Sequence, residues 1–103
     1  VEESADSNFI TSNVVNDNAD DGIDIETNNN TVFGNKGNRN GSNGLEADRQ
    51  DLGQTGNLFP NNVFNFDGEH GVCAEPGTAT NGGGNGGVGN GTPPDVDFNN
   101  PSC

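Results

Sequence analysis

The hydrophobic residues of this chain are sparse, and they recur at fixed distances from a repeated polar frame. Each frame holds three Asn or Asp residues spaced by five, followed by a glycine four residues later. The three frames are Asn8, Asn13, Asn18, Gly22; Asn30, Asn35, Asn40, Gly44; and Asn57, Asn62, Asp67, Gly71. A sequence period in the twenties is typical of solenoid proteins, in which successive repeats stack on one another.

The apolar residues follow the same register. Two residues after the first Asn of each frame come Ile10, Val32 and Phe59, and seven residues after it come Val15, Gly37 and Phe64. The glycines are followed at once by Ile23, Leu45 and Val72, and two positions later by Ile25, Ala47 and Ala74. Alternation of this kind indicates strands, and no stretch has helical periodicity. The pattern predicts three very short strands in each repeat, with turns at the Asn and Gly positions, where left-handed backbone is needed.

The repeat resembles a known family. The segment "NTVFGNKGNRNGSNGLEA" (residues 30 to 47) and its counterparts "NFITSNVVNDNADDGIDI" and "NLFPNNVFNFDGEHGVCA" resemble the right-handed parallel β-helix proteins of the pectin-lyase-like group, over about residues 8–75. The resemblance implies an all-β fold, a short right-handed parallel β-helix (solenoid) of about three coils. It also implies that like residues stack, so that Asn13, Asn35 and Asn62 form a ladder of mutually bonded amides. The strand spacing of about 4.8 Å in stacked sheets independently favours this ladder.

We expect three segments along the chain. Residues 1–7 form an extended N-terminal segment, residues 8–77 form the three-coil parallel β-helix, and residues 78–103 form a degraded fourth coil and a Gly/Pro-rich tail. The longer second repeat contains an insertion at about residues 51–55. The alternative for the Gly/Asn-rich C-terminal extension is a flexible linker.

Composition and charge narrow the functional classes. Only 26% of the residues are hydrophobic and the formal net charge is −13, which is usual for disordered chains, although the ordered repeat favours a folded one. The acidic balance argues against nucleic acid or an anionic membrane as a partner. No apolar run is long enough for membrane insertion.

The two cysteines, Cys73 and Cys103, predict one disulfide, with two free thiols as the alternative. Closing a loop of this length stabilises a fold by roughly 3–4 kcal/mol. The chain begins at Val1 without an initiator Met or a signal peptide, which is typical of a processed or truncated start. Together these features predict an exported chain located outside the cell or at the cell surface.

Clustered carboxylates make calcium the one cofactor to consider. The candidate ligands are Asp17, Asp20, Asp21 and Asp24, because hard cations prefer carboxylate oxygens. An EF-hand loop starting at Asp17 fails, since Ala19 and Asn28 occupy ligand positions. A solvated charged face is the simpler interpretation, so we predict no resident metal or other cofactor.

Three asparagines lie in glycosylation acceptor motifs: Asn29, Asn40 and Asn90. In a chain so rich in Asn, roughly two such motifs arise by chance. The motifs are compatible with an exported glycoprotein that carries glycans.

The sequence predicts no catalytic residues. Within the β-helix proteins, polygalacturonases combine paired aspartates, a Gly-His-Gly segment and an Arg-x-Lys segment. Here Asp20–Asp21 resembles the first and His70–Gly71 half of the second, but Glu69 precedes the histidine and no Arg-x-Lys follows. The cationic half of such a site is missing, so the chain is predicted not to be an enzyme.

A short β-helix with no amphipathic capping helix leaves strand edges open at its ends. We therefore expect a non-catalytic structural subunit that stacks head-to-tail with copies of itself into an extracellular fibre or sheath. The alternative is a C-terminal fragment of a carbohydrate-binding or carbohydrate-active β-helix protein. Sugar binding requires exposed aromatic rings on a side face, whereas Phe59 and Phe64 are predicted to point inward and the chain has no Trp or Tyr.

Overall fold

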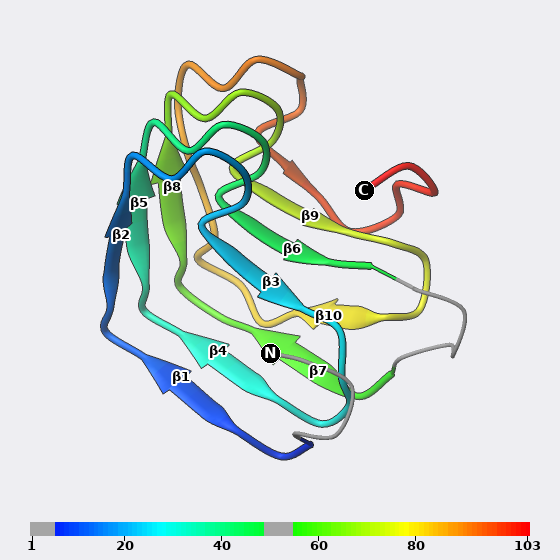
Figure 1. Ribbon diagram of the computed structural model, residues 1–103. Coiled ribbons are helices and arrows are strands. Elements are labelled where there is room, and N and C mark those ends of the chain that lie inside the picture. The colour runs from blue at the N-terminus through cyan, green and yellow to red at the C-terminus, as the bar shows by residue number, and fades with distance from the viewer. Residues whose placement is uncertain (1–5, 49–54) are drawn as a thin grey trace.

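The computed structural model describes residues 6–48 and 55–103, and all regular secondary structure within them is β-strand (Figure 1). Most of the predicted N-terminal segment and of the predicted insertion at 51–55 lies outside the described residues. The strands are β1 (Phe9–Thr11), β2 (Val14–Asn16), β3 (Ile23–Ile25), β4 (Thr31–Phe33), β5 (Lys36–Asn38), β6 (Leu45–Ala47), β7 (Asn57–Phe59), β8 (Val63–Asn65), β9 (Val72–Ala74), β10 (Ala79–Asn81) and β11 (Val96–Asp97).

The strands form three parallel sheets, and the chain visits them in the same order in each repeat. The first sheet has the order β1-β4-β7-β10, the second β2-β5-β8, and the third β11-β9-β6-β3. Figure 1 shows strands of successive repeats stacked side by side in each sheet. An all-β chain with three parallel sheets of this kind is consistent with a β-solenoid.

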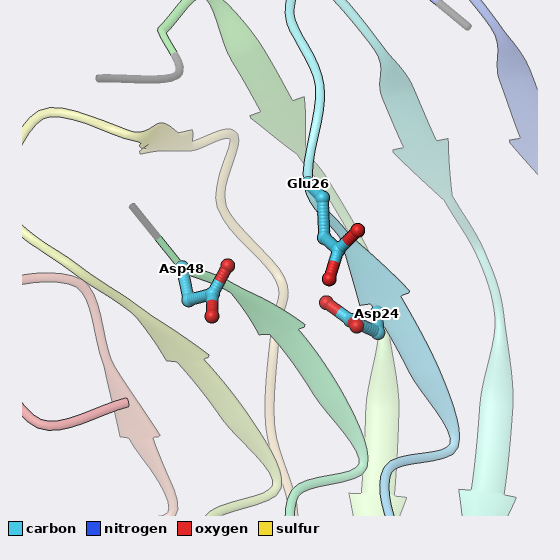
Figure 2. Close-up of side chains that lie close together, drawn as sticks. All are labelled: Asp24, Glu26 and Asp48. Atoms are coloured by element: carbon cyan, nitrogen blue, oxygen red, sulfur yellow. The ribbon is translucent and has the colours of Figure 1, made fainter. Parts of the chain in front are cut away.

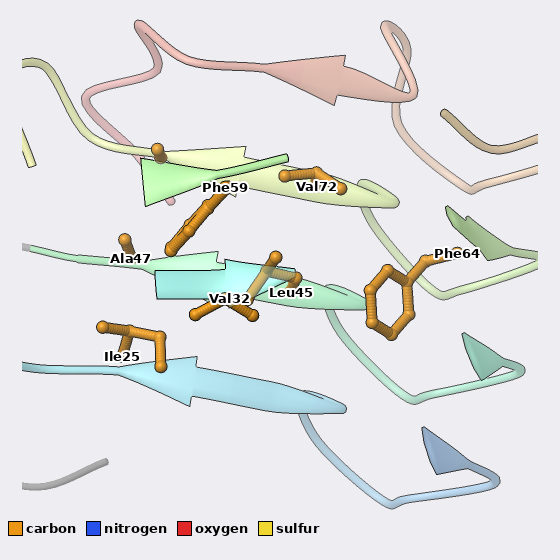
Figure 3. Packing of buried hydrophobic residues seen from close by; sticks show 8 residues of the cluster. Ile25, Val32, Leu45, Ala47, Phe59, Phe64 and Val72 are labelled. Atoms are coloured by element: carbon orange, nitrogen blue, oxygen red, sulfur yellow. The ribbon is translucent and has the colours of Figure 1, made fainter. Parts of the chain in front are cut away.

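The register predicted from the frames is present in the sheets. Ile10 pairs with Val32, Val15 with Gly37 and Gly37 with Phe64. Residues from all three sheets meet in one core, seen in Figure 3: Ile25, Val32, Leu45, Ala47, Phe59, Phe64, Val72 and Ala74, all without solvent exposure. The sparse apolar residues suffice because each repeat contributes only its inward positions.

The turns differ from the sequence prediction. The left-handed residue is not the Asn of the frame but the residue immediately before it, as at Ser12, Arg39 and Phe66, with φ of 59°, 57° and 56°. The frame glycines Gly22, Gly44 and Gly71 do not have a positive φ either. The reason lies in the ladder, because the frame Asn must direct its own backbone N–H along the stack. The preceding residue therefore makes the bend, whatever its side chain.

The C-terminal segment is paired with the rest of the molecule. β10 pairs with β7, Gly86 forms an isolated bridge to Val63, and β11 pairs with β9. Phe98 packs edge-on against Phe59, with ring centroids 6.0 Å apart. The predicted disulfide is present between Cys73 and Cys103, 30 residues apart in sequence. These contacts hold the Gly-rich segment against the third repeat.

Candidate functional site

The N-terminal strands of all three sheets lie at one edge. β1, β2 and β3 are each the terminal strand of their sheet on the same side of the stack. Phe9 and Val14 on these strands are 69% and 72% exposed. Among the described residues, no strand pairs with the outer sides of β1, β2 and β3, and exposed apolar side chains lie on two of these strands. Such an edge accepts further strands.

The backbone geometry specifies which groups face outward at this edge. Lys36 pairs with Val14, and the Lys36 N–H donates to the Asn13 carbonyl oxygen at 2.9 Å. In a parallel pair of strands, a residue such as Lys36 forms its hydrogen bonds with the residues on either side of its partner Val14. It forms none with Val14 itself. The N–H and C=O of Val14 therefore point away from β5, toward the open edge.

The asparagine ladder has a direction. The backbone N–H and the Nδ2 of Asn13 both donate to Oδ1 of Asn35, at 2.9 and 3.0 Å, and Asn35 donates in the same way to Asn62, at 3.0 and 3.1 Å. Each ladder side chain thus accepts from the repeat before it and donates to the repeat after it. Among the described residues, no donor reaches Oδ1 of Asn13, the exposed first member of its row.

The opposite end is closed over the third sheet. The last ladder residue of one row, Asn90, donates through Nδ2 to Oδ1 of Asp95 at 2.7 Å, so that Asp95 takes the place of a further ladder residue. His70 is 4% exposed and joins the tail through Nδ1 to the Pro94 carbonyl oxygen (2.8 Å) and Nε2 to Asn100 (3.0 Å). Since a carbonyl can only accept, the proton sits on Nδ1 and Asn100 donates to Nε2.

The outer face of the third sheet carries a row of residues that is mostly acidic. Asp24, Glu46 and Asp97 occupy equivalent outward positions, with Cys73 between Glu46 and Asp97. Glu46 is only 6% exposed, although the alternating pattern places it on an outer face, and Nδ2 of Asn43 donates to its Oε2 at 2.9 Å. Burial, followed by the negative charge of Asp21, raises the pKa of Glu46 to about 8.

Asp24 belongs to a compact carboxylate group with Glu26 and Asp48. One ligand oxygen from each of the three lies within 4.8 Å of the others, and Figure 2 shows them grouped across β3 and the end of β6. Burial, then the charges of Glu26 and Asp48, raises the pKa of Asp24 to about 6. Such a group is chemically able to share protons or to ligate a divalent cation such as Ca²⁺.

The predicted calcium candidates are not brought together. Of the four, only Asp24 lies in a potential metal-binding group within residues 6–48 and 55–103. Asp17 forms an exposed ion pair with Arg39 (2.7 Å), which lowers the pKa of Asp17, and Asp21 accepts the N–H of Asn43 at 2.8 Å. Asp20 is exposed. The next repeat, rather than the same loop, supplies the third member of the group that includes Asp24, and aligning Asp48 with its counterpart Glu26 would have indicated this.

The glycosylation candidates occupy different environments. Asn29 is exposed in a turn, with φ of 59°. Asn40 is 2% exposed, and its Nδ2 donates to Asp67 within the ladder. The Nδ2 of Asn90 is bonded to Asp95. A glycan on Asn40 or Asn90 would replace ladder hydrogen bonds, whereas one on Asn29 would project into solvent.

The residues compared with a polygalacturonase site are separated by an intervening side chain. Asp21 accepts from the Asn43 N–H, and Asn43 Oδ1 accepts from the His70 N–H at 3.1 Å. No pocket and no helix of membrane-spanning length and hydrophobicity occur in the described part of the chain.

Comparison of the chain with protein-family models, curated proteins and solved structures finds no match.

Proposed function

We propose that this chain is a non-catalytic structural subunit, folded as a right-handed parallel β-helix of the pectin-lyase-like kind, that stacks head-to-tail with copies of itself in an extracellular fibre or sheath. The observation that carries the proposal is the common edge formed by β1, β2 and β3, with its exposed Phe9 and Val14. A subunit with an open strand edge grows by main-chain hydrogen bonding, and an unlike contact that does not close gives a filament.

The ladder supports a parallel, head-to-tail joint. The incoming strands must supply N–H donors to Oδ1 of Asn13, the counterpart of Asn35, which accepts from the repeat before it. Two N-terminal edges facing each other would instead bring the Oδ1 acceptors of two Asn13 residues together. The C-terminal end of a second copy offers β10, the terminal strand of its first sheet, with Thr80 and Asn81 exposed.

The closure by Asp95 and His70 limits where the joint forms. Because the tail covers the end of the third sheet, stacking involves mainly the first and second sheets. The disulfide is compatible with the oxidising environment outside the cell.

Val14→Pro tests the stacking. Proline removes the N–H that faces the edge, and proline is tolerated where that N–H is not used inside a sheet. Negative-stain electron microscopy at neutral pH is expected to show fibres for the wild type and for Val14→Ala, which loses the same side chain but keeps the N–H. Val14→Pro is expected to remain unassembled with a nearly unchanged Tm. A wild type without fibres, or fibres in Val14→Pro, contradicts the proposal.

A carbohydrate-binding role is the second candidate, and one observation favours it. Phe9 and Phe33 are 69% and 39% exposed on the first sheet and Phe66 is 60% exposed, so the chain has exposed aromatic rings of the kind that sugar binding requires. Phe59 and Phe64 do point inward, as predicted. Affinity electrophoresis in gels containing neutral polysaccharides tests this role, with retardation expected for wild type and lost in Phe33→Thr.

A further inference from the structure

None of the four strands of the first sheet contains a charged residue. Val32 and Phe59 on this sheet are fully buried, so the alternate residues Thr31, Phe33 and Leu58 point outward. The four strands read FIT, TVF, NLF and ATN. Phe33 and Leu58, on the two inner strands, are 39% and 40% exposed, and Phe9 beside them is 69% exposed. The result is a flat, apolar and threonine-bearing face.

The charge of the molecule lies on the other side. Every acidic residue in the described part of the chain belongs to the third sheet or to the turns that flank it: Asp6, Asp17, Asp20, Asp21, Asp24, Glu26, Glu46, Asp48, Asp67, Glu69, Glu75, Asp95 and Asp97. The large exposed hydrophobic side chains lie mainly on the first and second sheets, as Phe9, Val14, Phe33 and Leu58 do, with Val88 beside the end of β8, whereas Phe66 lies beside Asp67 in the turn between the second and third sheets. A contiguous apolar face on a soluble protein usually marks a binding surface.

We propose that this face of the first sheet binds the same face of a second copy, giving a two-fold lateral pair. This lateral pair rests on the proposed function, because it would join subunits within the same assembly. The contact itself can form without head-to-tail stacking. Two chains of net charge −13 repel each other wherever their acidic sides meet. Pairing through the first sheet turns both acidic sides outward.

The molecule is large enough for salt to screen the repulsion between the two acidic sides of such a pair. The principal extents are 31, 27 and 25 Å, so the two acidic sides stand well beyond the Debye length of about 8 Å at physiological salt. The second sheet is a poorer candidate, because its outward row includes Lys36 and its other outward row is an amide ladder of Asn16, Asn38 and Asn65.

The size of the face predicts a weak pair. Strands spaced about 4.8 Å apart and about three residues long give a face near 14 by 10 Å before its turns are counted, well below the roughly 800 Å² per partner of a standard interface. The dissociation constant is therefore expected in the range of about 10–500 μM. Apolar rows at strand spacing can interdigitate, as facing sheets do about 10 Å apart.

Sedimentation equilibrium on the Val14→Pro variant tests the pair separately from edge stacking. We expect a reversible monomer–dimer equilibrium that tightens as salt rises from 50 to 500 mM. Adding Phe33→Glu and Leu58→Glu is expected to weaken the pair at least tenfold. The control Val63→Glu adds one charge to a half-buried outward position of β8 and is expected to change the constant less than twofold.

Phe33→Thr with Leu58→Thr provides a milder variant, since threonine already occupies this face and suits strands. It should weaken the pair while circular dichroism and Tm report an intact fold. A Val14→Pro protein that is monomeric at 500 μM overturns the inference, as does equal weakening by Val63→Glu. Retention of the monomer by a neutral polysaccharide such as dextran, lost in the same Thr variant, would assign the face to carbohydrate instead.

The two proposals fail in different ways. Fibres in the wild type with a monomeric Val14→Pro protein retain the stacking role and overturn the lateral pair. Dimers of Val14→Pro from a wild type that never forms fibres retain the pair and overturn the stacking role.

Discussion

At the residue scale, Asp67 is the irregular member of the ladder. Its Oδ1 accepts the backbone N–H and Nδ2 of Asn40 at 2.8 and 2.9 Å, as an asparagine would. Its Oδ2 is buried and has no hydrogen-bond partner among the residues that the structure describes, while Asp67 as a whole is 2% exposed. An asparagine there would donate from this position, as Asn62 does to the Val32 carbonyl oxygen. Burial raises the pKa of Asp67, and the two hydrogen bonds from Asn40 offset this effect only in part.

Asp67→Asn is expected to stabilise the protein by about 1–2 kcal/mol at pH 7–8, since it satisfies a buried position without a charge. The gain should shrink as the pH falls, because the raised pKa lets the protonated acid donate from Oδ2. Calorimetric Tm values between pH 4 and pH 8 measure both effects. The reciprocal change Asn40→Asp, one repeat earlier, should destabilise. A gain that does not vary with pH, or a less stable Asp67→Asn at pH 7, would contradict this account.

The ladder Asn13–Asn35–Asn62 could be predicted from sequence because its members are identical residues at the same position of each frame. The left-handed positions could not, since they are filled by Ser12, Arg39 and Phe66 without a common chemical property. The stacking of each repeat on its neighbours imposes that conformation, and local preference does not reveal it.

At the element scale, β5 lacks an inward side chain because its neighbour fills the space. A Cβ on Gly37 would lie 2.3 Å from the Val15 carbonyl oxygen and 2.5 Å from the Phe64 ring. In the sequence, Gly37 interrupts a row of apolar residues and therefore suggests poor packing at this position. In the structure, the missing side chain of Gly37 leaves room for the large ring of Phe64 in the next repeat.

Gly37→Ala is expected to cost near the upper end of about 1–3 kcal/mol, because backbone and ring must both move. Gly86→Ala is the matched control. Gly86 bridges Val63 in the same sheet, its φ is not positive, and a Cβ there meets no atom within 4 Å. Gly86→Ala should change the free energy of unfolding by less than about 1 kcal/mol. Urea unfolding followed by circular dichroism provides both values, and equal losses would show that the fit of Phe64 against Gly37 is not what matters.

At the scale of the whole molecule, the acidic side couples stability to pH. Asp24 and Glu46 have pKa values of about 6 and about 8 in the folded protein, above their ordinary values of 3.8 and 4.5. The folded state therefore holds protons that the unfolded state releases. This contribution to stability is complete below about pH 4 and is lost as the pH rises toward 8.

The Tm is accordingly expected to fall by several degrees between pH 5 and pH 8. One such group changes the free energy of unfolding by at most about 1.4 kcal/mol per pH unit. Glu46→Gln should flatten the upper part of this decline, whereas Glu69→Gln, at an exposed carboxylate, should leave it unchanged. A Tm that rises from pH 5 to pH 8, or an equal effect of the two substitutions, would contradict the proposed origin.

The sequence by itself determined the all-β class, the parallel register and the Asn13–Asn35–Asn62 ladder, because a stacked repeat places equivalent residues in contact and spacing is visible in one dimension. It also identified the pairing of Cys73 with Cys103, the two cysteines of the chain. Only the tertiary structure decided that Asp24 groups with Glu26 and Asp48 rather than with Asp17 and Asp20. Only the tertiary structure separated a neutral side from an acidic one. The carboxylate group and the separation of the two sides both depend on which outward side chains of different repeats share a face. The physical reason is that burial and charge repulsion act between neighbouring repeats of the stack, which are far apart along the chain.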